Sequence, residues 1–232
     1  MIHSKFRCEF YFIRHGESLS NAAPGLAAGV DHDAPLTPRG VAQARSLGHR
    51  LRHENTTFDR VYCSSFRRAI QTTEAMLEGM HEPGRPFAKV DALIEQQIPG
   101  WRGVPMHEAY TPATLAHMGA KGPDFVPPEG ESHRVVQRRL AAWIDDEFIY
   151  NRALTSEEQA LTVAVVGHGA ATRCLLQHIL GFDHRFIRRM ALDNCSISRF
   201  VFDTGGWFAI CINDSSHLRD VDERSILEAG RD

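Results

Sequence analysis

The stretch FYFIRHGESLSN, residues 10–21, joins an apolar run to an abruptly polar one. Its first four residues are continuously apolar, which is typical of a strand buried on both faces of a parallel sheet. The next four are an arginine, a histidine, a glycine and a glutamate. In open α/β sheets, ligands bind in the crevice beyond the carboxyl ends of the strands. The stretch therefore predicts a buried strand that leads directly into a ligand site.

Three further segments are short, apolar or β-branched, and bounded by polar turn formers, as strands usually are. They comprise residues 60–63, 89–95 and 161–166, and the run LTVAVV of the last segment is the strongest of them. Residues 196–213 contain two alternating runs around a DTGG turn, which predicts a β-hairpin.

Helices are predicted between the strands from their capping residues and apolar faces. Thr37 fits the N-cap of the first helix, and Pro38 fits its first helical position. Gly181 can supply a left-handed end to the last helix. The four predicted helices run from about Pro38 to about His53, onward from a cap at Ser64 or Ser65, from Glu131 to Phe148, and from directly after His168 to Gly181.

Alternating strands and helices predict an α/β fold, a three-layer αβα sandwich with a mostly parallel central sheet. The hairpin would add an antiparallel edge to that sheet. A chain of 232 residues with 43% hydrophobic content fits one sizeable domain, residues 1–232, better than two. Residues 104–130, rich in proline, glycine and methionine, are expected to form an irregular, lid-like excursion over one edge of the sheet.

Composition argues against several classes of function. With 26 basic and 29 acidic residues the net charge is −3, so neither a nucleic-acid groove nor a polybasic membrane anchor is expected. The five cysteines are far apart and mostly inside apolar runs, which indicates free thiols in a reducing compartment. The N-terminal apolar segment is short and runs into charged residues, so we expect no signal peptide, no membrane span and a cytoplasmic location.

Residues suited to phosphate chemistry follow each of the four predicted parallel strands. Because ligands of such sheets bind at the carboxyl ends of the strands, two arginines, two histidines and one carboxylic acid are expected to converge there. They are Arg14 and His15 after the first strand, Arg68 after the second, Glu95 at the end of the third, and His168 with Gly169 after the fourth.

These side chains fit phosphoryl transfer from a small phosphate ester. The planar forks of Arg14 and Arg68 can each grip two oxygens of a phosphate dianion, and helix N-termini at Arg68 and Gly169 would add backbone donors. A neutral imidazole can attack phosphorus when its other ring nitrogen keeps its proton in a fixed hydrogen bond. Glu95 is the expected proton donor for the leaving alkoxide.

Other common site motifs are missing from the sequence. It contains no GxSxG elbow, no GK[ST] phosphate loop and no GxGxxG turn, so serine hydrolases, P-loop proteins and dinucleotide-binding proteins have no support. The other histidines considered lack the paired spacing of a metal site, so they are expected to be solvated and no metal is predicted. They are His32, His49, His53, His107 and His117.

With these motifs the chain resembles the histidine phosphatase superfamily, in the branch that includes phosphoglycerate mutases. The matching pieces follow the family order along nearly the whole chain: RHGES, LTPRGVAQA, SSFRRAIQTTE, LIEQ, PPEGES, VVGHGAATR and LDNCSI. The resemblance implies a phosphoglycerate mutase-like fold, a phosphohistidine intermediate, and catalysis without a metal or other cofactor. The residues it implies are His15, Glu95 and His168 for catalysis, with phosphate contacts from Arg14, Asn21, Arg68, His168 and the Gly169 backbone.

The segment EQQIPGWRG departs from the family's usual pattern. Relatives of the phosphatase type often have Asp-Phe-Gly and Trp-Glu-Gly after the acid, whereas this chain has Ile98-Pro99, and Arg102 in place of an acid. Glu95 remains the expected acid, with Glu17 and Glu131 as alternatives.

The sequence favours hydrolysis over phosphate exchange. Family mutases carry extra basic residues beyond the catalytic acid, but here Arg102 and Lys121 are the only formal cations between Glu95 and Gly130. The same segment offers a mixed apolar surface for a modestly sized organic phosphate, formed by His107, Tyr110, Met118 and Phe125.

We therefore expect a phosphomonoesterase. A cofactor-dependent phosphoglycerate mutase is the first alternative, and a phosphate-binding regulatory module with little turnover is the second. Family members of that last kind usually lack a catalytic histidine or arginine, and this chain retains both. The sequence leaves the oligomeric state open.

Overall fold

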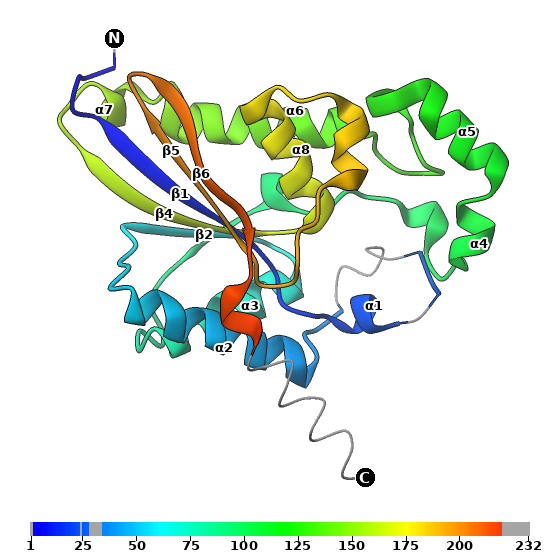
Figure 1. Ribbon diagram of the computed structural model, residues 1–232, viewed down its shortest axis with the longest axis horizontal. Coiled ribbons are helices and arrows are strands. Elements are labelled where there is room, and N and C mark those ends of the chain that lie inside the picture. Colours follow the sequence, from blue (N-terminus) through cyan, green and yellow to red (C-terminus); the bar gives the residue numbers. More distant parts are fainter. Residues whose placement is uncertain (1, 24, 28–33, 220–232) are drawn as a thin grey trace.

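The computed structural model describes residues 2–23, 25–27 and 34–219. A six-stranded sheet runs through them in the order β3-β2-β4-β1-β5-β6 (Figure 1). The first four strands of that order are parallel, and β5 and β6 form an antiparallel edge, so the predicted fold class is confirmed. The strands are β1 (Arg7–Arg14), β2 (Arg60–Ser64), β3 (Ala88–Val90), β4 (Ala160–Gly167), β5 (Ile197–Asp203) and β6 (Gly206–Asp214).

Helices cover both faces of the sheet (Figure 1). Side chains alternate between the faces along β1. Phe10 and Phe12 join the core that packs under α6 and α8, whereas Tyr11 and Ile13 join the core under α2 and α3. Because both faces of β1 are covered, its apolar run is buried as predicted. The four helices are α2 (Pro38–His53), α3 (Arg67–Gly79), α6 (His133–Ile144) and α8 (Gly169–Leu180).

Two helices follow their predicted caps. The Thr37 hydroxyl accepts a hydrogen bond from the Gly40 amide at 3.0 Å and Pro38 opens the first turn, so α2 has the expected bounds. α8 begins directly after His168 and ends before Gly181, which adopts the left-handed conformation with φ 66°.

The cap predicted for α3 was wrong. The helix begins at Arg67, and Phe66 rather than a serine occupies its N-cap. Ser64 is still part of β2, so the chain needs further residues to turn from the sheet into the helix. The Ser64 hydroxyl instead accepts a hydrogen bond from the Phe66 amide at 3.3 Å.

Two further elements differ in extent from their predictions. The strand expected over residues 89–95 ends at Val90 and gives way to a short 3-10 helix, Asp91–Leu93, because β3 is an edge strand that pairs only with β2 among the described strands. The helix expected over residues 131–148 begins later, after a Ser132 cap. Beyond α6 it continues as a π-helical turn, Asp145–Ile149, and the short helix α7 (Arg152–Thr155) then leads to β4.

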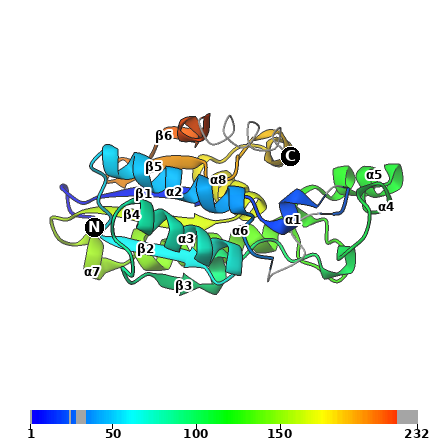
Figure 2. The same cartoon turned by 90° about the horizontal axis from the view of Figure 1, so that it is seen from below.

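The segment 104–130, expected to be an irregular excursion, contains two helices. It contains α4 (Met106–Ala109) and α5 (Pro112–Lys121), which lie beyond the carboxyl ends of the parallel strands (Figure 2). Thr111 caps α5 by accepting a hydrogen bond from the Thr114 amide at 3.1 Å. The segment packs around Trp101 in a small third core, whose other members include Ile98, Ala109, Tyr110, Met118 and Phe125.

The five cysteines are free thiols, and four of them are buried, as their apolar surroundings predicted. Within the described part of the chain, the helices are too short or too polar to cross a bilayer.

The backbone of the loop after β1 and that of α2 approach each other so closely that one added methyl group should destabilise the fold. A Cβ atom at Gly40 would overlap the carbonyl oxygen of Glu17, whereas one at Gly119 in α5 would meet nothing within 4 Å. We expect Gly40→Ala to lower the free energy of unfolding by roughly 1–3 kcal/mol through overpacking. Gly119→Ala, the matched control, should leave it unchanged or raise it by about 0.5–1 kcal/mol. Urea unfolding measures both, and a Gly40→Ala variant as stable as wild type would contradict the close contact.

Candidate active site

His15 follows β1 at the carboxyl edge of the sheet and is buried there, with 3% of its surface exposed. Its amide donates to the Gly167 carbonyl at 2.9 Å and so continues the pairing of β1 with β4. The ring nitrogen Nδ1 lies 2.7 Å from the carbonyl oxygen of Gly16, which can only accept, so Nδ1 carries the ring proton. The other ring nitrogen, Nε2, is therefore unprotonated.

Arg68 joins His15 to His168. It lies in the first turn of α3 and is 2% exposed. Its Nε lies 3.2 Å from Nε2 of His15 and 3.2 Å from Nδ1 of His168, and the two imidazole centroids are 5.1 Å apart. Side chains that follow three different strands thus meet at one point, as the sequence predicted.

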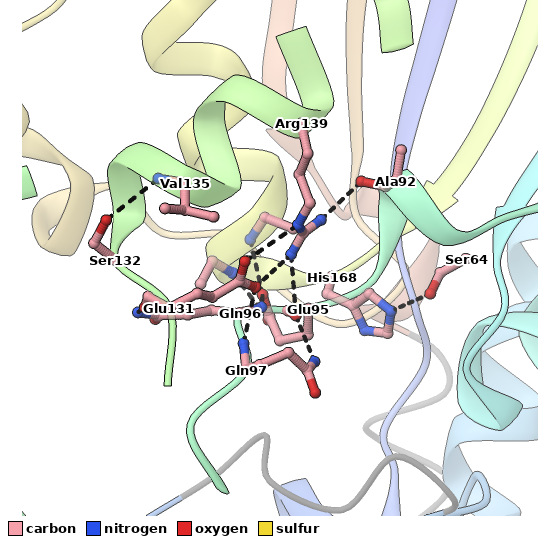
Figure 3. A network of polar contacts seen from close by, with 12 residues as sticks. Ser64, Ala92, Glu95, Gln96, Gln97, Glu131, Ser132, Val135, Arg139 and His168 are labelled. Carbon is pink, nitrogen blue, oxygen red and sulfur yellow. Dashed lines mark hydrogen bonds and ion pairs between the residues drawn. The ribbon is translucent and has the colours of Figure 1, made fainter. Parts of the chain in front are cut away.

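His168 is held from its other side by Ser64. Its Nε2 lies 2.7 Å from the Ser64 hydroxyl oxygen (Figure 3). Because Nδ1 accepts from Arg68, Nε2 carries the proton and donates it to Ser64. His15 and His168 therefore occupy opposite tautomers, and each presents an unprotonated nitrogen to the same guanidinium group.

The two imidazoles are neutral in the free protein. Burial lowers the pKa of His15 well below its usual value, and the nearby charges of Arg68 and then Arg14 lower it further. Burial also lowers the pKa of His168 well below its usual value, with Arg68 as the next cause. Protonation of either ring would set a second positive charge beside a buried guanidinium, which is unfavourable.

Arg14 and Arg173 flank Gly169 at the start of α8. The Nη1 of Arg14 donates to the Leu192 carbonyl, and the Nε of Arg173 donates to the Met190 carbonyl at 2.8 Å. A Cβ atom at position 169 would stand 3.3 Å from Nε of Arg14 and 3.6 Å from Nη1 of Arg173. A glycine at this position therefore leaves room for both guanidinium groups beside the helix N-terminus.

Glu95 lies beside the same helix N-terminus (Figure 3). Its carboxylate accepts hydrogen bonds from the amides of Ala171 at 2.8 Å and Ala170 at 3.1 Å, and from the Gln96 amide at 2.9 Å. Arg139 of α6 donates to the Glu95 backbone carbonyl at 3.1 Å and so anchors this segment. Glu95 thereby satisfies amides that the first turn of α8 cannot pair internally. Glu95 was expected at the end of the third strand, but β3 already ends at Val90.

The two alternative acids are engaged elsewhere. Glu17 accepts from the Thr37 hydroxyl at 2.8 Å and pairs with Arg39 at 2.8 Å. Glu131 pairs with Arg139 at 2.8 Å (Figure 3). Neither carboxylate lines the cleft that contains His15, whereas Glu95 does.

Asn21 lies in the short helix α1 (Leu19–Ala22) and lines the same cleft. Its Oδ1 accepts hydrogen bonds from the Ser18 hydroxyl at 3.1 Å and from Nδ2 of Asn194 at 3.3 Å. Asn194 also donates to the His15 carbonyl at 2.9 Å. The loop before β5 thus fixes both the RHG turn and α1.

All the residues predicted for the site except His168 line one cleft of about 460 Å³. Four arginines line it, and Glu95 is the one carboxylate among its described lining residues. Such an excess of positive charge suits an anionic ligand. The predicted residues found in this lining are Arg14, His15, Asn21, Arg68, Glu95 and Gly169, with His168 held against them through Arg68.

A side pocket of about 240 Å³ adjoins the cleft beneath the helices of segment 104–130. Tyr110, Met118 and Phe125 line it, as predicted for the substrate surface, but His107 does not, because its side chain is 82% exposed to solvent. The two cavities share five lining residues, Gln96, Ile98, Tyr110, His133 and Arg188.

Several residues of the site were not predicted. Arg173 could have been found, because it lies four residues after Gly169 and so shares the same helix face. Ser64 was predicted to be a helix cap. Arg188 lies in a segment that has no periodic pattern, so the sequence did not show that it would line the site. The residues missed are Ser64, Arg139, Arg173, Arg188 and Asn194.

The other histidines predicted to be solvated are exposed where the structure describes them, at positions 49, 53, 107 and 117, and His32 lies outside the described residues. His133 and His184 form a pair that the sequence did not reveal, with Nδ1 of the first 3.4 Å from Nε2 of the second. Within the described ranges, no group of three or more His, Cys, Asp or Glu side chains could hold a metal ion.

Solved structures with the same fold include both phosphatases and mutases. A phosphoserine phosphatase mutant from Entamoeba histolytica, in complex with phosphoserine, matches with a TM-score of 0.75 and 21% identity over 91% of this chain and 99% of that one. A phosphoglycerate mutase from Bacillus anthracis str. Sterne matches with a TM-score of 0.76 and 20% identity over 94% of this chain and 98% of that one. At these identities the similarity establishes the fold.

Sequence comparison identifies the family. A probable phosphoglycerate mutase of Proteus mirabilis (strain HI4320) is 28% identical over 223 residues, which are 92% of this chain and 96% of that protein. The family model described as histidine phosphatase superfamily (branch 1) matches residues 10–215. The chain belongs to the histidine phosphatase superfamily.

Proposed function

We propose that the protein is a phosphomonoester hydrolase that works through a phosphohistidine at His15. The observation that carries this proposal is the tautomer of His15. Its proton is fixed on Nδ1 by the Gly16 carbonyl, and its unprotonated Nε2 lies 3.2 Å from Nε of Arg68, with both residues lining the cleft. An imidazole in that state is a nucleophile that needs no base to activate it.

The reaction takes two displacement steps at phosphorus. In the first, Nε2 of His15 forms a P–N bond, the P–O bond to the alcohol breaks, and Glu95 gives its proton to the leaving alkoxide. In the second, Glu95 takes a proton from water, the oxygen attacks phosphorus, and the P–N bond breaks. Inorganic phosphate leaves and His15 returns to its starting state.

Charge in the cleft stabilises the transferring group. Arg14, Arg68 and Arg173 face a phosphoryl group whose oxygens carry the developing negative charge, and fixed donors of this kind are a large part of enzymatic rate enhancement. The start of α8 at Gly169 contributes backbone donors and its dipole. His168 remains neutral and fixes Arg68 through its Nδ1.

The mutase alternative gains one observation in its favour. Arg102 and Lys121, the cations counted between the acid and Gly130, line neither cavity, but Arg173 and Arg188 line the cleft from a later part of the chain. Additional cations are what a mutase uses to retain a phosphorylated acid. Hydrolysis remains the proposal, because a cleft of about 460 Å³ has room for water beside a small ester.

We expect hydrolysis of para-nitrophenyl phosphate in the presence of EDTA, with a phosphorylated enzyme that is labile in acid and stable in alkali. His15→Ala should lower kcat by roughly 10³-fold or more and abolish the labelled enzyme, because it removes the attacking nitrogen. His53→Ala, which removes an exposed histidine at the end of α2, is the control and should match wild type. Equal rates for wild type and His15→Ala would contradict the nucleophile. No activity in either protein across a broad pH range would favour the binding module.

The protonation states predict a pH dependence of stability. Because the pKa of His15 and that of His168 are lowered in the folded protein, the unfolded chain binds protons that the folded chain excludes once the pH falls below about 6.5. The free energy of unfolding should then fall by up to about 1.4 kcal/mol per pH unit for each histidine. His15→Asn removes one of these groups, so urea unfolding should show a shallower acid slope for the variant. Above about pH 7.5, the plots of unfolding free energy against pH for wild type and His15→Asn should run parallel. If they also run parallel at acid pH, His15 is not held neutral in the folded protein.

With 3-phosphoglycerate as substrate, we expect release of inorganic phosphate and little of the 2-isomer. In the proposed reaction, water takes the phosphoryl group before the product acid does, because Arg102 and Lys121, the cations that follow the catalytic acid, line neither cavity. Phosphate release and isomer formation are measured in the same reaction mixture. Formation of 2-phosphoglycerate without phosphate release would reverse the choice between hydrolase and mutase.

A further inference from the structure

The side pocket continues the cleft away from His15, towards the segment 104–130. Tyr110, His133 and Arg188 line both cavities and so mark the passage between them. In the proposed reaction the phosphoryl group occupies the cleft, so the alcohol part of the ester points along this passage. The chemistry of the side pocket therefore bears on which alcohol the site accepts.

The walls of the side pocket are mainly apolar and aromatic. Trp101, Leu115, Met118 and Phe125 contribute to them. Trp101 packs against Tyr110 with ring centroids 4.9 Å apart, so the aromatic wall is an ordered part of the small third core. A volume of about 240 Å³ holds a group of about the size of an aromatic ring rather than a large cofactor.

A single cation that is not neutralised enters this apolar space. Arg188 lies over the Tyr110 ring at 5.9 Å, and its Nη2 lies 3.5 Å from the Met118 sulfur. Among the described residues no carboxylate pairs with it and none lines the side pocket. The other arginine of the pocket, Arg185, is paired with Asp183 at 2.9 Å.

The neighbouring imidazoles do not add charge. Burial lowers the pKa of His133 to about 4, with His184, Arg188 and Arg173 as further causes. The pKa of His184 is also lowered, by burial first and by Arg188 next. Both rings are therefore neutral near pH 7, and both lie in the positive potential of Arg188.

We propose that the side pocket is the leaving-group subsite and that Arg188 selects phosphomonoesters whose alcohol carries a carboxylate on a compact apolar body. This inference rests on the proposed hydrolase function and names the class of substrate. One positive charge matches a carboxylate monoanion, which can bind a guanidinium fork through two oxygens. A second phosphate group would bring a dianion to this single cation. The remaining arginines of the cleft, at positions 14, 68 and 173, lie with the transferred phosphate.

The test compares three aryl phosphates on one scaffold, para-carboxyphenyl phosphate, para-carbamoylphenyl phosphate and the bisphosphate of hydroquinone. The carboxylate and the carboxamide have nearly the same shape, so the ratio of their kcat/KM values reports recognition of the charge. We expect wild type to prefer the carboxylate by about tenfold, the lower end for a charge-assisted hydrogen bond at a partly exposed site. In Arg188→Gln this ratio should fall close to one, mainly through KM.

Arg189→Gln is the matched control, because Arg189 is the next residue, is also exposed, and lines neither cavity. It should keep the wild-type ratio. A ratio near one in wild type, or a preference that survives Arg188→Gln, would overturn the subsite while hydrolysis itself stands. A preference for the bisphosphate would overturn the carboxylate assignment. No turnover of any of the three esters, nor of phenyl phosphate, would overturn the hydrolase function and the subsite with it. Because each ratio is taken within one protein, partial misfolding of a variant does not change its meaning.

Discussion

A buried guanidinium shared by two neutral imidazoles is the interaction on which the rest of the site depends. Arg68 is 2% exposed, and its Nε lies at the same distance from the acceptor nitrogens of His15 and His168. Arg14, Arg173 and Arg188 line the same cleft as Arg68, and this excess of positive charge favours an anionic ligand there. Burial, and next the charge of Arg68, lower the pKa of both rings and keep them neutral, which is the state that a nucleophilic imidazole requires.

The fold supplies this arrangement through short-range constraints. β1 and β4 pair in parallel with Arg14 opposite Gly167, so His15 and His168 leave the sheet side by side. The Gly16 carbonyl, Ser64 and Asn194 then fix the rings and the turn. Glu95 reaches the start of α8 from an unrelated segment and is held there by backbone amides and Arg139. The loop after β1, the carboxyl end of β4 and the start of α8 are therefore held together around the position that we propose for the phosphate.

Much of this was readable in the sequence, because apolar periodicity and capping residues report local structure. The run before Arg14, the Thr37 cap and the glycine at position 181 each predicted a correct element. The strand ends predicted that the side chains of positions 14, 15, 68 and 168 would meet. The predictions of the third strand's length and of the cap of α3 were wrong, because tertiary contacts set both the pairing of an edge strand and the path of the chain from sheet to helix. Arg188 and the pair His133–His184 could not be found, because nothing in their local sequence shows which elements meet around segment 104–130.

The most direct measurement of the central claim is a crystal structure of the protein with orthovanadate, an analogue of the transferring phosphoryl group. We expect vanadium bonded to Nε2 of His15, with its oxygens against the guanidinium groups of Arg14 and Arg68 and the start of α8. Vanadate bonded to His168 or to Nδ1 of His15, or bound outside this cleft, would contradict it.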